Sequence, residues 1–539
     1  MKENNIQHSS LVSNILIDND NQSVPYIDSY RQSDRSANKP IITNLEGSEE
    51  KDELQDAIGY TDSNIFLPET LCTESFSASN IFLENPNDAR KDVAETPAQF
   101  VTQSCITYII TGLAFVSSGL IFDNQKNGAF LSRYSLGVML APALLGLKGN
   151  IETTFASRLT TAFHCGKLQK RSAAISYFFG NMALVQIQSV LVSMFIVICA
   201  STIGIFFTQG TTLNRHFVEQ IFVLMAAAII STSLCSLFLG FFLFAILKYS
   251  KKWEINPDNF LAPLSASLGD FITMILFLLS GYLFVVIGNH VNSFARIAIP
   301  IFIVIFFILF GAYCGYVAYN ETSSKKVLKN GWLPIIVASA VSNVAGYILE
   351  DGKLDKKGML LLQPLICGLL GNRVSVQCSR LSSSLHKSKV EYGKFPNNNS
   401  LYSFFNPLNT YFAGDFNSKI AISQIITSVP AQYMFASLSF LINETYHVKK
   451  VFYLYYALLF FFLMVVLMHV CNSFVHLIWM MKHDPDTVSI PILTSVTDVV
   501  STFGLYILLS NIGDGIKYIN PNQHGSGYCE SNNTSTFSA

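Results

Sequence analysis

Residues 142–164 read PALLGLKGNIETTFASRLTTAFH, and residues 364–386 read PLICGLLGNRVSVQCSRLSSSLH. The two segments share the pattern P-x3-G-x2-G-N-x6-S-R-L-x4-H without a gap, with Pro142 and Pro364 as corresponding residues. A second pattern, P-D-x4-P-x3-S-x2-D, begins at Pro257 and again at Pro485. Two long patterns that recur in the same order indicate an internal duplication.

The composition is that of a membrane protein. Of the 539 residues, 50% are hydrophobic and only 13% are charged, with a mean hydropathy of +0.38, whereas soluble domains are about 25% charged. Apolar windows of roughly 20 residues, the length that crosses a hydrocarbon core about 30 Å thick, recur along the chain. We predict eleven spans, near residues 100–122, 135–163, 180–208, 217–247, 259–287, 297–319, 331–350, 358–384, 420–442, 451–481 and 488–510.

These spans predict an all-α polytopic membrane protein built from two five-helix units. The odd span between the units returns the chain to its starting side, so both units insert in parallel and form a pseudo-dimer within one chain. The predicted parts are a disordered acidic tail (1–99), a first transmembrane domain (100–290), a connector helix and loop (291–330), a second transmembrane domain (331–512) and a short C-terminal tail (513–539).

The N-terminal tail differs in charge from the body. Residues 1–100 carry a net charge of −11 and the remainder +10, and the tail lacks the apolar surface that folding requires. The acidic run at 49–53 is a candidate docking motif for cytosolic regulators, against the simpler interpretation of a solvated tail. Loop Lys and Arg favour a cytosolic N-terminus by fourteen to ten, although the sequon at Asn398 would then lie inside. No cleavable signal precedes the first span. We expect the plasma membrane, with an endomembrane or mitochondrial membrane as alternatives.

Two acidic residues of the second pattern, Asp270 and Asp498, are the main candidates for a functional site. Each follows the Pro-Asp of its pattern by twelve positions, which is about 18 Å along a helix and therefore near the bilayer midplane. A carboxylate at that depth costs about 2.5 kcal/mol or more on insertion scales, and such residues usually mark ion pathways. The alternative is a structural Asp that is protonated or paired with Arg.

Polar residues at helical spacing accompany the two carboxylates. Ser267 and Thr273 flank Asp270 at i−3 and i+3, and Ser495 and Ser501 flank Asp498 in the same way, so each helix has one polar face. Carboxylate, hydroxyl and carbonyl oxygens without a thiolate or imidazole cluster favour Mg²⁺, Ca²⁺ or Mn²⁺. Mg²⁺ leads, because it keeps its waters and can be held through them by one or two carboxylates.

The first pattern adds further candidates. Asn150 and Asn372 are predicted amide ligands, and the glycines beside them permit close helix approach or exposed carbonyls. Residues predicted to line or gate the pathway without binding the ion directly are Thr273, Ser501, Glu152, Asp258, Asp486, Arg158 and Arg380. The two arginines either snorkel to the interface or pair with the Pro-Asp carboxylates. The predicted metal ligands are Asp270, Asp498, Asn150, Asn372, Ser267 and Ser495.

At these motifs the sequence resembles solute carrier family 41, the eukaryotic relatives of bacterial MgtE magnesium transporters. The resemblance rests on Pro142 to Leu159, on the Pro257-Asp-Asn stretch that ends in Leu-Gly-Asp270, and on their second copies, and it covers about residues 100–512. It implies two MgtE-like domains that transport Mg²⁺ and other divalent cations, with Asp270 and Asp498 matching the family's pore carboxylate for hydrated Mg²⁺. The large cytosolic sensor of bacterial MgtE has no counterpart in the short polar tail.

The mechanism of transport stays open at the level of sequence. The resemblance implies Na⁺-coupled exchange, but the residues indicate no separate Na⁺ site, so a channel without coupling is the alternative. No G-x4-G-K-[ST] motif is present, which disfavours direct drive by ATP. We predict no enzymatic activity. An intramembrane aspartyl protease is disfavoured because the motif around Asp498 lacks the glycine that precedes Asp270, and a structural scaffold would not need duplicated buried carboxylates.

Overall fold

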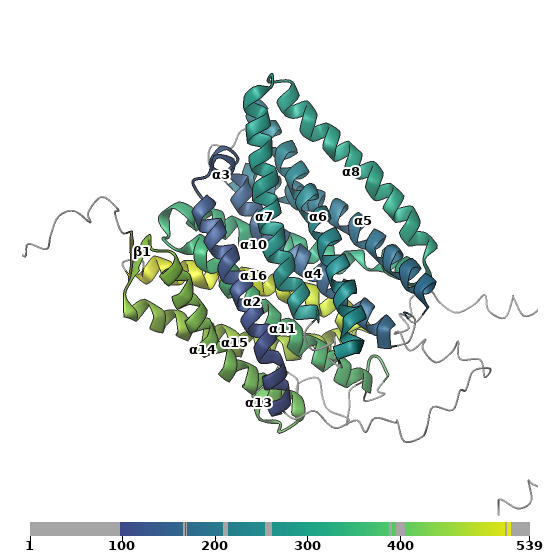
Figure 1. Ribbon diagram of the computed structural model, residues 1–539. Coiled ribbons are helices and arrows are strands. Elements are labelled where there is room, and N and C mark those ends of the chain that lie inside the picture. Colours follow the sequence, from purple (N-terminus) through teal and green to yellow (C-terminus); the bar gives the residue numbers. More distant parts are fainter. Residues whose placement is uncertain are drawn as a thin grey trace, which may run out of the picture. The chain divides into compact units, whose positions relative to one another are not determined.

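The computed structural model describes residues 97–164, 168, 170–207, 214–253, 261–387, 391–394, 405–512 and 515–518. Within these residues the chain is almost entirely helical (Figure 1), which confirms the predicted all-α class. The predicted disordered tail lies outside the described residues up to residue 96, and its last three residues belong to the first helix.

In the described part of the chain eleven helices are long, and each of them covers most of one predicted span. They are α2 (Pro97–Gln125), α4 (Leu136–His164), α5 (Arg171–Phe207), α6 (Arg215–Trp253), α7 (Leu261–His290), α8 (Ala295–Asn320), α10 (Trp332–Asp355), α11 (Met359–Lys387), α14 (Phe416–Ile442), α15 (Lys450–Met480) and α16 (Pro485–Ile512). Within the described residues, nine of them are long and apolar enough to cross a membrane, and α2 and α4 lie outside that set. The polytopic membrane class is therefore confirmed, while the count of eleven spans stays a prediction.

Short elements lie between the long helices and after the last of them. They are α3 (Ala129–Arg133), α9 (Thr322–Asn330), α13 (Pro407–Phe412), β1 (Tyr446–Val448) and β2 (Ile516–Tyr518). The two strands pair antiparallel, with Tyr446 opposite Tyr518. Part of the predicted C-terminal tail is thus attached to the loop between α14 and α15.

The contacts of the first five long helices are matched by contacts of the last five. α2 packs against α7, α11 and α14, and α10 packs correspondingly against α16, α4 and α5. α4 packs against α7 as α11 packs against α16. The first helix of each set therefore contacts the second helix of the other set, and neither set forms a separate bundle.

Two glycines permit α2 and α10 to pack closely against helices of the other set. A Cβ atom at Gly119 of α2 would collide with the backbone carbonyl of Leu361 in α11, and one at Gly346 of α10 would collide with that of Met139 in α4. Small residues at helix crossings allow the backbones to approach closely in lipid. Met139 and Leu361 are corresponding residues of the duplication, because each lies three positions before the proline of the Gly-Asn pattern.

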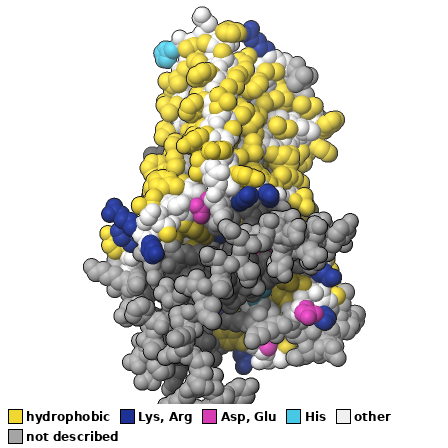
Figure 2. All heavy atoms as spheres, turned by 90° about the vertical axis from the view of Figure 1, so that its right-hand side faces the viewer, with side chains coloured by type: hydrophobic (Ala, Val, Ile, Leu, Met, Phe, Trp, Pro, Cys, Tyr) yellow, Lys and Arg dark blue, Asp and Glu magenta, His cyan; other side chains and the backbone are white. Residues whose placement is uncertain are grey.

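The outer helices carry the apolar surface. α8 lies along the outside of α5 and α6 (Figure 1) and is the least buried of the nine candidate spans, whereas α11 is the most buried. Phe302, Leu309 and Tyr313 of α8 are exposed. The face shown in Figure 2 is covered over much of its area by hydrophobic side chains, with Lys and Arg gathered at its edges. Such a surface suits contact with lipid, and the polar helices α4 and α11 lie inside.

Candidate functional site

A cavity of about 60 Å³, with both polar and apolar lining residues, lies where α4, α7, α11 and α16 meet. Since about 10–15 Å³ is enough for one water molecule, the cavity has room for several. Its polar lining comes from both halves of the chain and consists of Asn150, Thr153, Asp270, Gln363, Asn372, Ser375, Thr494 and Asp498. Four of the six predicted metal ligands therefore share one cavity, although they come from four different helices.

Asp498 lies in the middle of α16 and is held from two other helices. The Ser342 hydroxyl of α10 donates a hydrogen bond to its Oδ2 at 3.1 Å. On the α4 side, a Cβ atom added at Gly146 would lie 2.9 Å from the same oxygen. The repeated glycine thus gives the carboxylate space against α4, and the hydroxyl fixes its orientation.

Asp270 occupies the matching position of α7 but has fewer partners. Its Oδ1 is buried and has no hydrogen-bond partner among the described residues. On the α4 side, a Cβ atom added at Gly149 would lie 3.7 Å from that oxygen. The two carboxylates are close enough to interact electrostatically. Two carboxyl groups in a small cavity, one of them with an unsatisfied oxygen, can hold a cation or its bound water.

The two asparagines also differ in their hydrogen-bond partners. Asn150 of α4 accepts a hydrogen bond from the Thr494 hydroxyl of α16, at 2.9 Å. Asn372 of α11 also lines the cavity, and its Nδ2 has no hydrogen-bond partner in the described part of the chain. Amide, hydroxyl and carboxylate oxygens from four helices converge here, which is the donor set that hard divalent cations prefer.

The predicted hydroxyl ligands lie beside the cavity. Ser267 and Ser495 are buried and donate to carbonyls one turn back in their own helices, those of Leu264 and Ile492. Neither lines the cavity.

The hydroxyl residues predicted for the pathway have similar positions. Thr273 and Ser501 are buried and also lie outside the lining. Ser501 donates to the Thr497 carbonyl and lies 3.0 Å from the sulfur of Cys367, which itself lines the cavity.

Glu152 is fully buried and forms an ion pair that the sequence analysis did not anticipate. Lys148, one turn earlier on α4, donates to its Oε1 at 2.5 Å and is also hydrogen-bonded to Ser236 of α6. Neither Lys148 nor Glu152 lines the cavity. A lysine in the middle of a predicted span was a visible signal, since such charges are rare in membranes and usually paired.

The remaining predicted residues lie far from the cavity or outside the described residues. Asp258 lies outside them. Asp486, in the first turn of α16, approaches His386 near the end of α11. The Arg380 guanidinium lies 6.0 Å from the ring centre of Phe416, and the Arg158 carbonyl accepts a hydrogen bond from Tyr177.

Several lining residues had no distinguishing signal in the sequence. Gln363 lies immediately before the proline of the repeated pattern, and its Oε1 is buried without a hydrogen-bond partner in the described residues. Phe115 of α2 packs on Gly368 and closes one side. Ser342 and Thr494 are ordinary helical hydroxyls, and their contacts with Asp498 and Asn150 depend on how α10, α16 and α4 pack together.

Comparison with known proteins gives a consistent result. The sequence model of the family described as MgtE, divalent cation transporter, matches the chain twice, at residues 141–280 and 363–508. The two matches begin one position before Pro142 and Pro364, and they end ten positions after Asp270 and Asp498, so their bounds follow the two repeated patterns. No solved structure gives a significant match.

Three relatives illustrate the similarity to whole proteins. Solute carrier family 41 member 2 of mouse is 30% identical over 421 residues, covering 76% of this chain and 70% of the relative. The member 3 protein of rat is 30% identical over 405 residues, covering 74% of this chain and 84% of the relative. The member 2 protein of Xenopus laevis is 29% identical over 439 residues, covering 79% and 75%.

Proposed function

Because the chain belongs to the MgtE family of divalent cation transporters, which are membrane transporters and not enzymes, we propose that it carries Mg²⁺ through the cavity between α4, α7, α11 and α16. Asp270 and Asp498 hold the ion, partly through its water shell. The observation that carries the proposal is the meeting of these two carboxylates in one cavity with Asn150 and Asn372.

The donor chemistry supports Mg²⁺ in particular. The polar side chains of the lining are carboxylates, amides and hydroxyls, together with one thiol, that of Cys367, and the rest of the lining is apolar or glycine. Mg²⁺ binds through a few carboxylates while keeping several waters, whereas Ca²⁺ needs six to eight protein or water oxygens in a wider site. The space for several waters fits a partly hydrated ion.

A pathway on a pseudo-twofold axis is the second part of the proposal. It is supported by the matched contacts of the two sets of helices and by the two family matches. We therefore propose two MgtE-like domains, 100–290 and 331–512, joined by a connector at 291–330, that work as a pseudo-dimer within one chain.

The proposal also covers ion coupling and the resident membrane. We propose Na⁺-coupled exchange of Mg²⁺, with an uncoupled Mg²⁺ channel as the alternative. The excess of Lys and Arg on one side supports a cytosolic N-terminus, and the plasma membrane is the proposed site. The acidic tail is the proposed contact for cytosolic regulators.

The test is Mg²⁺ flux in proteoliposomes, with and without a Na⁺ gradient. We expect Asp270→Asn and Asp498→Asn each to abolish flux, while Asp355→Asn, an exposed carboxylate at the end of α10, transports like wild type. Dependence on the Na⁺ gradient separates exchanger from channel. If both cavity variants are folded and transport normally, the proposed pathway is wrong.

A further inference from the structure

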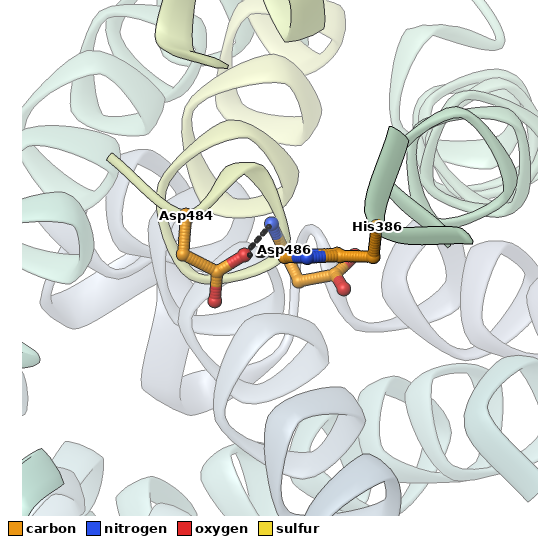
Figure 3. Close-up of side chains that lie close together, drawn as sticks. All are labelled: His386, Asp484 and Asp486. Carbon is orange, nitrogen blue, oxygen red and sulfur yellow. Dashed lines mark hydrogen bonds and ion pairs between the residues drawn. The ribbon is translucent and has the colours of Figure 1, made fainter. Parts of the chain in front are cut away.

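A second group of metal-ligating side chains lies about 18 Å along α16 from the cavity, since Asp486 precedes Asp498 by twelve positions of helix. His386, in the last turn of α11, and Asp484 and Asp486, at the start of α16, each offer one ligand atom, and these atoms lie within 4.8 Å of one another. Figure 3 shows the imidazole and the two carboxylates converging from the two helices. Among the described residues, this is the one group of three or more such side chains with that geometry.

The imidazole is held in position by aromatic rings. His386 packs edge-on against Trp479 at 5.1 Å, and Tyr392 stacks on the same indole at 4.3 Å. The Gly393 amide donates to the Trp479 carbonyl, which fixes residues 391–394 to the end of α15. The ring therefore points at the carboxylates from a rigid support.

Asp484 also contacts the other two residues directly. His386 Nε2 lies 3.3 Å from Asp484 Oδ1, and this oxygen also accepts a hydrogen bond from the Asp486 amide as a helix cap. Tyr392 lies near both carboxylates: burial, and then the charges of Asp484 and Asp486, raise the pKa of its phenol.

One nitrogen and two carboxylate oxygens select a class of ion. Imidazole is a good ligand for Zn²⁺, Fe²⁺ and related ions, and Mn²⁺ accepts it beside carboxylates, whereas Mg²⁺ strongly prefers oxygen. His386 and Asp484 are half-buried, so an ion could reach them from solvent.

The first half of the chain carries a weaker version of the same sequence. Its Pro-Asp motif reads Asn256-Pro257-Asp258, where the second reads Asp484-Pro485-Asp486, although each half has a histidine at the corresponding place, His164 and His386. Asn256 thus stands where the second half has Asp484, so the sequence provides all three ligands in the second half and two of them in the first.

We propose that His386, Asp484 and Asp486 form a regulatory site for a divalent transition-metal ion such as Mn²⁺ or Zn²⁺, separate from the Mg²⁺ cavity. An ion bound there ties the end of α11 to the start of α16. These are the two helices that carry Asn372 and Asp498, so occupancy restricts their relative movement and slows Mg²⁺ flux. The binding site is independent of the proposed function, and only its effect on flux rests on it.

The experiment is pulsed electron paramagnetic resonance of the full-length protein in nanodiscs with substoichiometric Mn²⁺ and excess Mg²⁺. The excess Mg²⁺ keeps Mn²⁺ out of the oxygen-lined cavity. We expect a directly coordinated imidazole ¹⁴N signal in the wild type and its loss in His386→Gln. Asp484→Asn introduces the residue found at the corresponding position of the first half and keeps a helix-capping side chain. It should weaken Mn²⁺ binding about tenfold or more.

The controls separate this site from the cavity. His483→Gln, at an exposed neighbouring histidine, should keep the ¹⁴N signal, and so should the double variant Asp270→Asn/Asp498→Asn, which is expected not to transport. Absence of the signal in wild type, or its persistence in His386→Gln, overturns the site. Equal inhibition of Mg²⁺ flux by Mn²⁺ in wild type and Asp484→Asn overturns its regulatory role.

Discussion

Asp498 and Asp270 occupy corresponding positions of α16 and α7, yet their surroundings differ. Asp498 accepts a hydrogen bond from Ser342, while Asp270 Oδ1 has no partner among the described residues. The position in α2 that corresponds to Ser342 is Phe115, since each lies four positions before the glycine that crosses the other half. Phe115 packs on Gly368, as Ser342 approaches Gly146.

The helices that carry the asparagines differ as well. α4 contains the buried pair Lys148 and Glu152, and the residues at the corresponding positions of α11 are Leu370 and Val374. The duplication therefore preserves the scaffold and the two carboxylates, while the polar partners are concentrated around Asp498 and α4. An ion held between the halves meets two unequal sides.

The largest expected effect concerns the buried ion pair. Glu152→Gln leaves the Lys148 charge without a carboxylate in the membrane interior, and we expect a loss of about 3–5 kcal/mol in the free energy of unfolding. The double variant Lys148→Leu/Glu152→Val, which introduces the residues of the second half, should be close to wild type. Equilibrium unfolding in mixed micelles measures both, and equal losses would contradict the interpretation.

The next effect concerns the space in front of Asp498. Gly146→Ala places a methyl group 2.9 Å from Asp498 Oδ2, and overpacking of this kind costs about 1–3 kcal/mol. We expect Mg²⁺ flux to fall about tenfold or more in proteoliposomes. The matched control is Gly371→Ala on α11, where no atom lies within 4 Å of the added Cβ. A similar fall in both variants would contradict a specific role for the contact with Asp498, since Gly371 also lines the cavity.

The hydroxyl beside Asp498 is expected to have an effect of similar size, but on ion affinity. Ser342→Ala removes a hydrogen bond to a charged group, worth about 1.5–3 kcal/mol, and should raise the apparent KM for Mg²⁺ about tenfold. Ser339→Ala is the control, because the Ser339 hydroxyl donates to the Ile335 carbonyl of its own helix. Concentration dependence of flux distinguishes them, and an unchanged KM in Ser342→Ala would make the two carboxylates equivalent.

The smallest expected effect concerns the asparagines. Thr494→Ala removes a neutral hydrogen bond to Asn150, worth about 1 kcal/mol, and should weaken apparent Mg²⁺ affinity about fivefold. Ala266 is the corresponding residue of α7 and also lines the cavity. Ala266→Thr should therefore strengthen affinity by a similar factor. Opposite changes in Mg²⁺ affinity for the two variants would support the inequality of the two sides, and changes in the same direction would refute it.

Much of the fold could be predicted because its signals are local. Hydropathy over about 20 residues depends on one segment at a time, and each predicted span coincides with a long helix within about two turns at either end, apart from α5, which begins at Arg171 and not near residue 180 as predicted. The start of α5 is amphipathic and partly exposed, so hydropathy alone missed it.

The site could be predicted only in part. The two carboxylates and two asparagines, which line one cavity, could be singled out because they recur at fixed offsets, and residues that recur in both halves are expected at corresponding places in space. Ser342, Thr494 and Gln363 do not recur, so the same argument could not find them. Ser267 and Ser495 do recur, but their helices turn these hydroxyls away from the cavity lining.

The sequence by itself determined a helical membrane protein with repeated sequence patterns and the positions of its two acidic residues along their helices, since hydropathy, repeat offset and helical rise are properties of the chain alone. The tertiary structure decided which polar groups meet. The partner of Asn150 comes from the opposite half, because α16 contacts α4, and the partner of Asp498 comes from α10, which lies far away along the chain. The inequality of the two sides follows from these contacts, and His386 meets Asp484 and Asp486 because α11 packs on α16.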